Sequence, residues 1–432
     1  MIERQTVTLK IYTHNLMTLT LVFLLWQIGY SFAEETYPPF NYVLGTQTFQ
    51  PKYQFTEETR LVETAMQIEE MGSNILKILI DSDYSDHYML PQNTDINSFT
   101  SLLDKEPSYR KVLRMPFDYY FFWAHCSPIE DGEWKPHYDW AQGYSESQRI
   151  DEYQQIYDLT CYLLTEFDNS GKTFFLGHWE GDWAIMGEPY SRDREISQKA
   201  FDGMIERMNT RQLAVDNAKR DTPHKNVDVF HYMETVLVED AIKKGKKTLT
   251  NSVLPYVNVD LVSFSCYSSL GSFWEGNLTM EKRKETMKTS LLKALDFIEK
   301  HMPPTDKKYP WDKRVFIGEY GFRRFHRGSQ KISITAQQQA EFTRTASAAA
   351  LSWGCPFALY WQMYDNESEE GGANPSGLAL IDKDNQKQPA YLVHKNFYRR
   401  ANDFIDRCRS DFRRNPTQAE FREEALKWLL SE

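Results

Sequence analysis

Short apolar runs alternate with longer amphipathic stretches between about residue 43 and residue 365. Runs of this length with little internal polarity are typical of strands that are buried on both faces, as in parallel sheets. The pattern predicts eight strands, at Val43–Thr48, Ile75–Ile80, Val112–Met115, Thr173–Leu176, Val227–His231, Leu261–Ser265, Val315–Ile317 and Phe357–Trp361. Each predicted strand is followed by a stretch that is long enough for a helix or a loop.

The stretches between these runs carry helical periodicity. In Glu57–Met71 the residues Leu61, Ala65 and Ile68 fall on one face, and the same spacing recurs in Ser147–Phe167, Ile196–Asn217, Lys282–His301 and Ala336–Leu351. Eight strand–helix units over roughly 320 residues predict a (β/α)₈ TIM barrel with insertions. A doubly wound open sheet is the competing α/β fold, but no glycine-rich phosphate loop follows the first predicted strand.

Two long loops are predicted on the same face of this barrel. They follow the third and the eighth strands, at Phe117–Tyr144 and Asp365–Ser376. Both therefore belong to the carboxyl face, where the active sites of such barrels form. The first loop begins with the aromatic run Tyr119–Trp123, which is either a platform for sugar rings or packing beneath the loop.

The ends of the chain predict an export signal and a helical extension. Residues 1–33 combine Arg4 and Lys10 with an apolar stretch and a small-residue cleavage pattern ending at Ala33, which together resemble a secretory signal peptide. An uncleaved anchor is the alternative, although the apolar stretch is short for a membrane span. We therefore expect a secreted or periplasmic protein without a stable membrane span. Its catalytic domain would cover residues 34–410 and a C-terminal helical extension residues 411–432.

Charge and composition narrow the function classes. The formal net charge of −11 disfavours nucleic acid as a partner, because nucleic-acid binding rewards clusters of Lys and Arg. The five cysteines and ten histidines form no motif with metal-ligand spacing, so we expect neither a metal nor another cofactor. Aromatic residues make up 14% of the chain, which suits an oligosaccharide or polysaccharide substrate.

Two glutamates, Glu180 and Glu319, stand immediately after strand-like runs and are separated by three of the predicted repeats. Hydrolysis of a glycosidic bond requires such a pair, one as proton donor and one as nucleophile or general base. Aromatic and acidic neighbours would raise the pKa of Glu180, so we predict Glu180 as acid/base and Glu319 as nucleophile. Glu234 is a rival carboxylate that ranks lower because only two repeats separate it from Glu319.

Three segments in the second half of the chain resemble motifs of a known protein family. Arg314–Phe322 (RVFIGEYGF), Ala358–Asp365 (ALYWQMYD) and Gly377–Tyr391 (GLALIDKDNQKQPAY) resemble the seventh strand, the eighth strand and the common tail of the clan A glycoside hydrolases, the cellulase- and mannanase-like barrels. The resemblance implies a retaining mechanism. It also implies that Trp361 lines the sugar site and that Tyr267 hydrogen-bonds the nucleophile.

The chain departs from this family at the acid/base motif. Trp179 stands where the family has an asparagine that contacts the sugar 2-hydroxyl, and Ser265 stands where the cellulases often have histidine. His178 and His231 are predicted to supply imidazoles to sugar hydroxyls instead, and Arg114 to position a carboxylate or a sugar. The departures leave an alternative, a catalytically inactive barrel that binds a glycan. An unrelated barrel lyase or isomerase has little support, because no phosphate loop follows the seventh or eighth strand.

Overall fold

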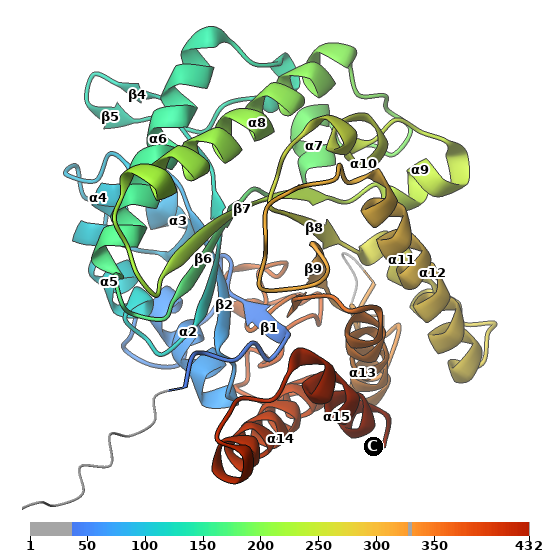
Figure 1. Ribbon diagram of the computed structural model, residues 1–432. Helices are drawn as coiled ribbons and strands as arrows, with labels where there is room; N and C mark the ends of the chain where they lie inside the picture. Colours follow the sequence, from blue (N-terminus) through green and yellow to red (C-terminus); the bar gives the residue numbers. More distant parts are fainter. Residues whose placement is uncertain (1–36, 327–330, 432) are drawn as a thin grey trace, which may run out of the picture. The chain divides into compact units, whose positions relative to one another are not determined.

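The protein is a closed barrel of eight parallel strands surrounded by helices (Figure 1). The computed structural model describes residues 37–326 and 331–431, so the predicted signal peptide lies outside the described residues. In spatial order the strands are β1 (Leu44–Gln47), β10 (Ala358–Tyr360), β9 (Val315–Tyr320), β8 (Leu261–Ser265), β7 (Asp228–Thr235), β6 (Thr173–Gly177), β3 (Tyr119–Ala124) and β2 (Ile75–Ile80). The predicted (β/α)₈ fold is confirmed.

Helices separate successive strands and form the outer layer. They are α2 (Arg60–Met71), α3 (Tyr84–Tyr88), α4 (Phe99–Lys105), α5 (Pro107–Leu113), α6 (Glu146–Glu166), α7 (Gly181–Met186), α8 (Gln198–Asp221), α9 (Val238–Lys244), α10 (Leu249–Ser252), α11 (Tyr267–Leu270), α12 (Met280–His301), α13 (Ala336–Trp353), α14 (Pro389–Phe412) and α15 (Gln418–Leu430). None of the described helices is long and apolar enough to cross a membrane.

The predicted third strand is wrong. Val112 and Leu113 end helix α5, and the strand is the aromatic run Tyr119–Ala124. The helix begins with Glu106, whose side chain caps it, followed by a proline at its first position, a start signal that outweighs the short apolar run. Val112 is buried because it lies on the inner face of this helix. Over so few residues, the apolar pattern of a buried helix face cannot be distinguished from that of a buried strand.

The interior of the barrel is packed with aromatic rings. Phe121 stacks on Phe175 at 4.2 Å between ring centroids, and Phe357 and Phe316 lie 4.9 and 5.3 Å from the same ring. We call these four residues the aromatic layer. Further along β9, Gly318 faces inward, and a Cβ added there would lie 1.8 Å from the Ser263 hydroxyl oxygen. The missing side chain thus makes room for polar groups toward the carboxyl ends of the strands.

The long loops also have structure of their own. The chain leaves β3 at Ala124 and forms a small hairpin, β4 (Ile129–Glu130) with β5 (Glu133–Trp134), before α6 begins. After β10, the Asp365 carboxylate accepts hydrogen bonds from the backbone N–H groups of Ser376 and Gly377. These bonds fold the segment between Asp365 and Ser376 back onto its own start.

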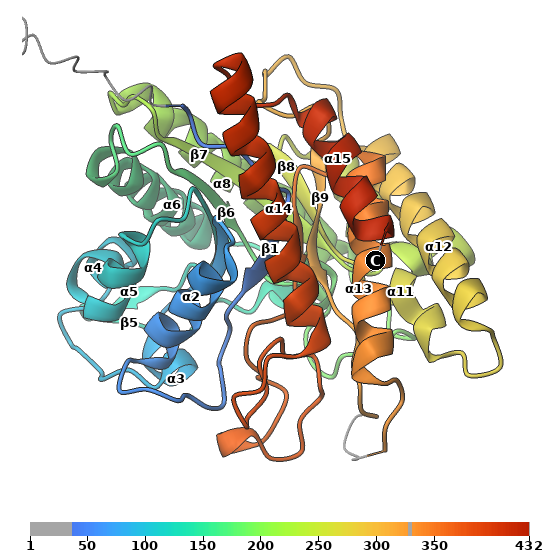
Figure 2. The ribbon, with the colours of Figure 1, turned by 90° about the horizontal axis from the view of Figure 1, so that it is seen from below.

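The C-terminal helices lie side by side on the outside of the barrel (Figure 2). The ring of Phe397 in α14 is 6.2 Å from Phe421 and 5.9 Å from Trp428, both in α15. Arg422 of α15 donates a 3.0 Å hydrogen bond to the carbonyl oxygen of Gly354, just before β10. The last helix is therefore held by aromatic packing and by a backbone contact at the amino end of the sheet.

Candidate functional site

Glu180 and Glu319 lie at the same rim of the barrel, joined through strand β8. Ser265, the last residue of β8, is the register partner of Glu319 in β9, and its hydroxyl donates a 2.5 Å hydrogen bond to Glu180 Oε1. Two residues further on, the Tyr267 hydroxyl donates to Glu319 Oε2 at 3.1 Å. Glu180 and Glu319 are 139 positions apart in the chain, but the residues that hydrogen-bond to them, Ser265 and Tyr267, are only two positions apart.

Each of the two carboxylates has one oxygen that makes no hydrogen bond to the described residues. These are Glu319 Oε1 and Glu180 Oε2. Glu319 is only 3% exposed, and Lys77 Nζ lies 3.8 Å from its free oxygen, whereas Glu180 is partly exposed. Each residue of the pair therefore keeps one oxygen without a hydrogen bond to the described residues, and that of Glu319 is buried.

The environment raises the pKa of both carboxyl groups. Burial raises the pKa of Glu180 to about 7; the nearby charge of Glu234 adds to this, and the hydrogen bond from Ser265 opposes it. Burial also raises the pKa of Glu319 well above its usual value, against the Lys77 ammonium and the Tyr267 hydroxyl, which favour the ionised form. Burial thus favours the protonated form of both groups, and Lys77 is the cation that opposes this effect at Glu319.

Lys77 and Glu234 complete the site; the sequence did not predict Lys77 there, and it predicted Glu234 only as a lower-ranked rival carboxylate. Glu234 is fully buried, and its Oε2 accepts hydrogen bonds from Lys77 Nζ at 3.3 Å and the Ser263 hydroxyl at 2.7 Å. Its Oε1 accepts from the backbone N–H of Glu180 at 3.0 Å. We call Lys77, Glu180, Glu234 and Glu319 the carboxylate cluster.

The sequence contains a signal that places both Lys77 and Glu234 inside the barrel. Side chains of a strand point alternately to its two faces. In β2, Lys77 lies between the inward-facing Ile75 and Leu79, and in β7, Glu234 continues the inward face of Phe230 and Tyr232. A charged residue on the inner face of a buried strand needs a partner, which pairs Lys77 with the acidic residues across the barrel.

The side chains of the two predicted sugar-binding histidines are buried and do not reach the mouth of the barrel. His178 is fully buried; its Nε2 accepts from the Glu234 backbone N–H at 3.2 Å, and its Nδ1 lies 3.1 Å from the Trp179 carbonyl oxygen. His231 is in the middle of β7 on the outward face, where Arg211 of α8 donates to its Nε2 at 3.3 Å. The expectation for these residues is corrected: β7 continues to Thr235, so His231 does not end the strand.

Arg114 does not belong to the site. It lies just past the end of helix α5, exposed to solvent, and pairs with Glu166 of α6 at 3.1 Å. The prediction for Arg114 depended on a third strand at residues 112–115. Because this segment is the end of helix α5, Arg114 lies on the outer helix layer and not inside the barrel.

Aromatic rings line the rim beside the carboxylate cluster. Trp361, just past β10, stacks on Phe49 with ring centroids 5.2 Å apart, and Trp123 of β3 lies 5.9 Å from it. Lys77 Nζ sits over the Trp123 ring at 4.2 Å. The rest of the Tyr119–Trp123 run packs inside the sheet or against the helices, so packing accounts for most of this run and only Trp123 reaches the rim.

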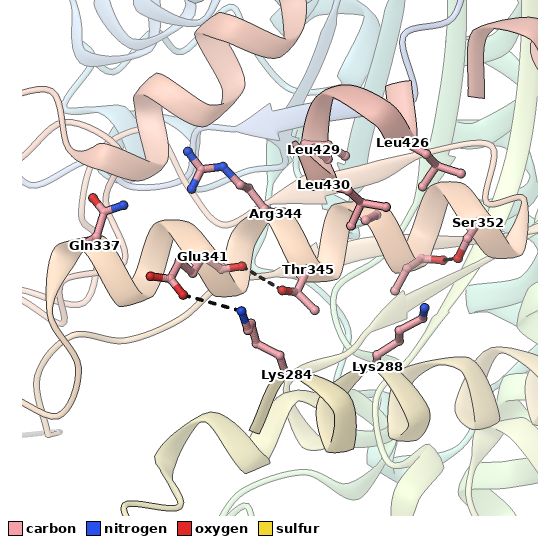
Figure 3. Close-up of a pocket in the computed structure, with 12 residues that line it drawn as sticks. Lys284, Lys288, Gln337, Glu341, Arg344, Thr345, Ser352, Leu426, Leu429 and Leu430 are labelled. Atoms are coloured by element: carbon pink, nitrogen blue, oxygen red, sulfur yellow. Dashed lines mark hydrogen bonds and ion pairs between the residues drawn. The ribbon is translucent and has the colours of Figure 1, made fainter. Parts of the chain in front are cut away.

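A separate groove lies on the outer helix layer, with lining residues from α12, α13 and α15 (Figure 3). Its sides carry Lys284 and Glu341, which pair at 3.7 Å, and its end carries Leu426 and Leu430. None of its lining residues comes from a strand end. The groove is therefore distinct from the rim that holds the carboxylate cluster.

Comparison with known proteins supports the fold. No protein-family model matches the chain. No curated protein matches it by sequence. Among solved structures, a GH5_18 protein from Streptomyces cattleya in complex with Manb1-4GlcNAc aligns over 83% of this chain and 80% of its own, with 11% identity and a TM-score of 0.52.

Two further solved structures have lower TM-scores. A GH5_18 protein from Bifidobacterium longum subsp. infantis gives 14% identity and a TM-score of 0.49 over 79% of this chain and 73% of its own. An FMN-binding beta-glucuronidase from Facaelibacterium prausnitzii gives 13% identity and a TM-score of 0.45 over 84% of this chain, which spans only 44% of that protein. The chain thus has the (β/α)₈ barrel fold that is found in the GH5 glycoside hydrolases of clan A.

Proposed function

We propose that the protein is an exported retaining glycoside hydrolase that cleaves β-linked glycans. The observation that carries this proposal is the pair of carboxylates at one rim, each with one oxygen held by β8 or its following turn and one oxygen without a hydrogen bond to the described residues. Double displacement needs one protonated and one ionised carboxyl group within reach of the same glycosidic bond. The solved structures that share this barrel include glycoside hydrolases, which supports the same class of chemistry.

In the first step Glu319 attacks the anomeric carbon while Glu180 donates its proton to the departing oxygen. A pKa of about 7 leaves Glu180 largely protonated below neutral pH, as a general acid requires. In the second step Glu180, now ionised, takes a proton from water, which releases the sugar from Glu319. The hydrogen bond that Tyr267 donates holds one oxygen of Glu319 and leaves the other oxygen to form the bond.

Lys77 and Glu234 influence the ionisation and the position of Glu180 and Glu319. Lys77 stabilises the ionised form of Glu319 against the burial that disfavours it. Glu234 accepts the backbone N–H of Glu180, and its negative charge raises the pKa of both Glu180 and Glu319. We place Trp361 and the partly exposed Trp179 against the sugar rings, as the aromatic surfaces on the two sides of the pair.

The test is a pair of variants assayed on activated 2,4-dinitrophenyl β-glycosides and on β1,4-linked oligosaccharides. Glu319→Ala should lose about ten thousandfold in kcat, and sodium azide should restore release of the phenol with an α-glycosyl azide as product. Glu180→Ala should still release the phenol in the first step, because a dinitrophenolate leaves without a proton, but should release the sugar slowly; azide should then accelerate turnover and yield a β-glycosyl azide. Glu281→Ala, which removes an exposed glutamate of α12, is the matched control and should equal the wild type.

The same assay separates the proposal from an inactive glycan-binding barrel. Trp179 in place of asparagine and the low exposure of Glu319 are the features that favour the inactive barrel. Oligosaccharide binding without any product from the folded wild-type protein would establish that alternative. Unchanged turnover in Glu319→Ala would contradict the proposed nucleophile.

A further inference from the structure

We propose that the groove on the outer helix layer binds a free long-chain fatty acid, with the carboxylate at Lys288 and the hydrocarbon chain along α13 against the last turn of α15. The groove has a volume of about 370 Å³, within the usual range for small-molecule sites. It lies between α12 and α13, and α15 packs against α13 at one end of it (Figure 3). The inference is independent of the proposed function, because the described lining residues all come from these three helices.

The floor of the groove is one face of α13. Its lining positions, spaced as on one side of a helix, include Thr345, Ala348, Ala349 and Ser352. The Thr345 hydroxyl donates to the Glu341 carbonyl oxygen at 2.9 Å. The Ser352 hydroxyl donates to the Ala349 carbonyl oxygen at 2.9 Å. Because these hydroxyl protons are already used within the helix, the floor offers mainly methyl and methylene surface to a ligand.

The apolar end of the groove is formed by the last turn of α15. The three leucines that line it are Leu426, Leu429 and Leu430, and Figure 3 shows them beside α13. Leu429 is only 5% exposed and anchors this turn in the core, whereas Leu430 is 73% exposed. Contact with a hydrocarbon chain would remove this exposed apolar surface from water, which is favourable.

The α12 side of the groove is basic, in contrast to the chain as a whole. The formal net charge of the chain is −11, but the charged lining residues are Lys284, Lys288, Arg344 and a single acid, Glu341. Lys284 pairs with Glu281 at 2.8 Å and with Glu341 at 3.7 Å. The Lys288 ammonium group, in contrast, has no ion pair or hydrogen bond with any residue that the structure describes. An ammonium group without a partner in a basic groove favours an anionic ligand.

An acyl chain suits this groove better than a peptide does. The lining residues of α13 run from Gln337 to Ser352, fifteen positions or roughly 22 Å along the helix axis, so the groove is long. A peptide lying along it would bring backbone N–H and C=O groups that need partners, which the floor does not supply. A hydrocarbon chain needs no hydrogen-bond partner, and its one charged end meets Lys288.

The experiment titrates the full chain with dodecanoate by isothermal calorimetry, below the concentration at which this soap forms micelles. We expect one dodecanoate per chain and no measurable binding of acetate, which has the same head without the chain. Dodecyltrimethylammonium, which has the same chain and the opposite charge, should bind at least tenfold more weakly. Decanoate should bind about fourfold more weakly than dodecanoate, about twofold for each methylene, because a groove covers one side of the chain only.

Two variants test where the ligand lies. Lys288→Glu should weaken dodecanoate binding about tenfold, because it replaces an attractive charge with a repulsive one. Lys282→Glu makes the same change at an exposed position of α12 outside the groove and should change binding less than twofold. Leu430→Ser should weaken binding about fivefold. Its control is Leu213→Ser, at a 54% exposed position of α8, which should have no effect.

Four results would overturn the proposal. They are no binding of dodecanoate, several bound equivalents that neither groove variant changes, equal losses in the groove variants and their controls, and binding only to phosphatidylglycerol vesicles. The last result would assign the groove to a bilayer surface instead of a free fatty acid. Because the titration involves no turnover, its outcome is separate from that of the proposed hydrolase function.

Discussion

The aromatic layer and the carboxylate cluster occupy the inside of one barrel, yet they are built on opposite principles. The aromatic layer, formed by Phe121, Phe175, Phe316 and Phe357, fills its space with rings 4.2 to 6.1 Å apart and carries no polar side-chain atom. The cluster places three carboxyl groups and one ammonium where burial disfavours every charge. The first arrangement stabilises the fold, and the second holds reactive groups in place at a cost to stability.

The two regions meet along single strands. In β9, Phe316 belongs to the aromatic layer and Glu319 to the cluster, separated by a register shift between β8 and β9. The rings beneath give the strands a rigid base, and Gly318 leaves the space that Ser263 and Glu234 occupy. The comparison therefore predicts that substitutions in the aromatic layer change stability alone, while substitutions in the carboxylate cluster also change the ionisation of the reacting groups.

The largest effect is expected from Lys77→Met, which removes the cation of the cluster. The variant leaves buried carboxyl groups without compensation, so we expect a loss of about 3–5 kcal/mol in unfolding free energy. Lys77 lowers the pKa of both Glu319 and Glu180, so both limbs of the pH profile should move to higher pH. Urea unfolding and the pH dependence of kcat/KM measure the two effects, with the exposed Lys282→Met as control. An unchanged profile would show that Lys77 does not act on the pair.

The next effect is expected from Phe316→Ala in the aromatic layer. Truncating a buried phenylalanine should lower the free energy of unfolding by about 3–5 kcal/mol, because it leaves a cavity among the rings. The pKa values that govern activity should stay in place, since no group of the cluster loses a hydrogen bond. Measurement of kcat/KM against pH on the folded variant checks this. A shift of either limb would mean that the two regions are not separable.

The smallest effect is expected from Glu234→Gln, which keeps the shape of the side chain and removes its charge. The negative charge of Glu234 raises the pKa of Glu180, so its removal should lower that pKa from about 7. The alkaline limb of kcat/KM should then move to lower pH, opposite in direction to Lys77→Met, with a loss of maximal activity of about tenfold or less. A shift to higher pH would contradict the assigned position of Glu234.

The barrel was predictable because each strand–helix unit is marked by a pattern in a short, continuous stretch of sequence. Seven of the eight strands fall where apolar runs mark them, and each run is short, buried and followed by a helix or loop. The third strand was missed because the aromatic run Tyr119–Ala124 was assigned to a loop. Its alternation of inward and outward rings is the feature that identifies it as a strand.

The site was only partly predictable because it depends on contacts across the barrel. Glu180 follows the end of β6 and Glu319 lies in the last residues of β9, positions that the apolar runs mark in the sequence. Lys77 and Glu234 take their place in the site from their contact with each other, although they are 157 positions apart in the chain. His231 was misassigned because a strand end set four residues early placed an outward side chain at the mouth.

The central claim is tested most directly by trapping the intermediate. The wild-type protein is incubated with 2,4-dinitrophenyl 2-deoxy-2-fluoro-β-glycosides, digested with pepsin, and analysed by tandem mass spectrometry. The account predicts one glycosyl group per chain, carried by the side chain of Glu319. A label on Glu234 or another carboxylate would contradict it. So would turnover of the unsubstituted glycosides without any label and with inversion at the anomeric carbon.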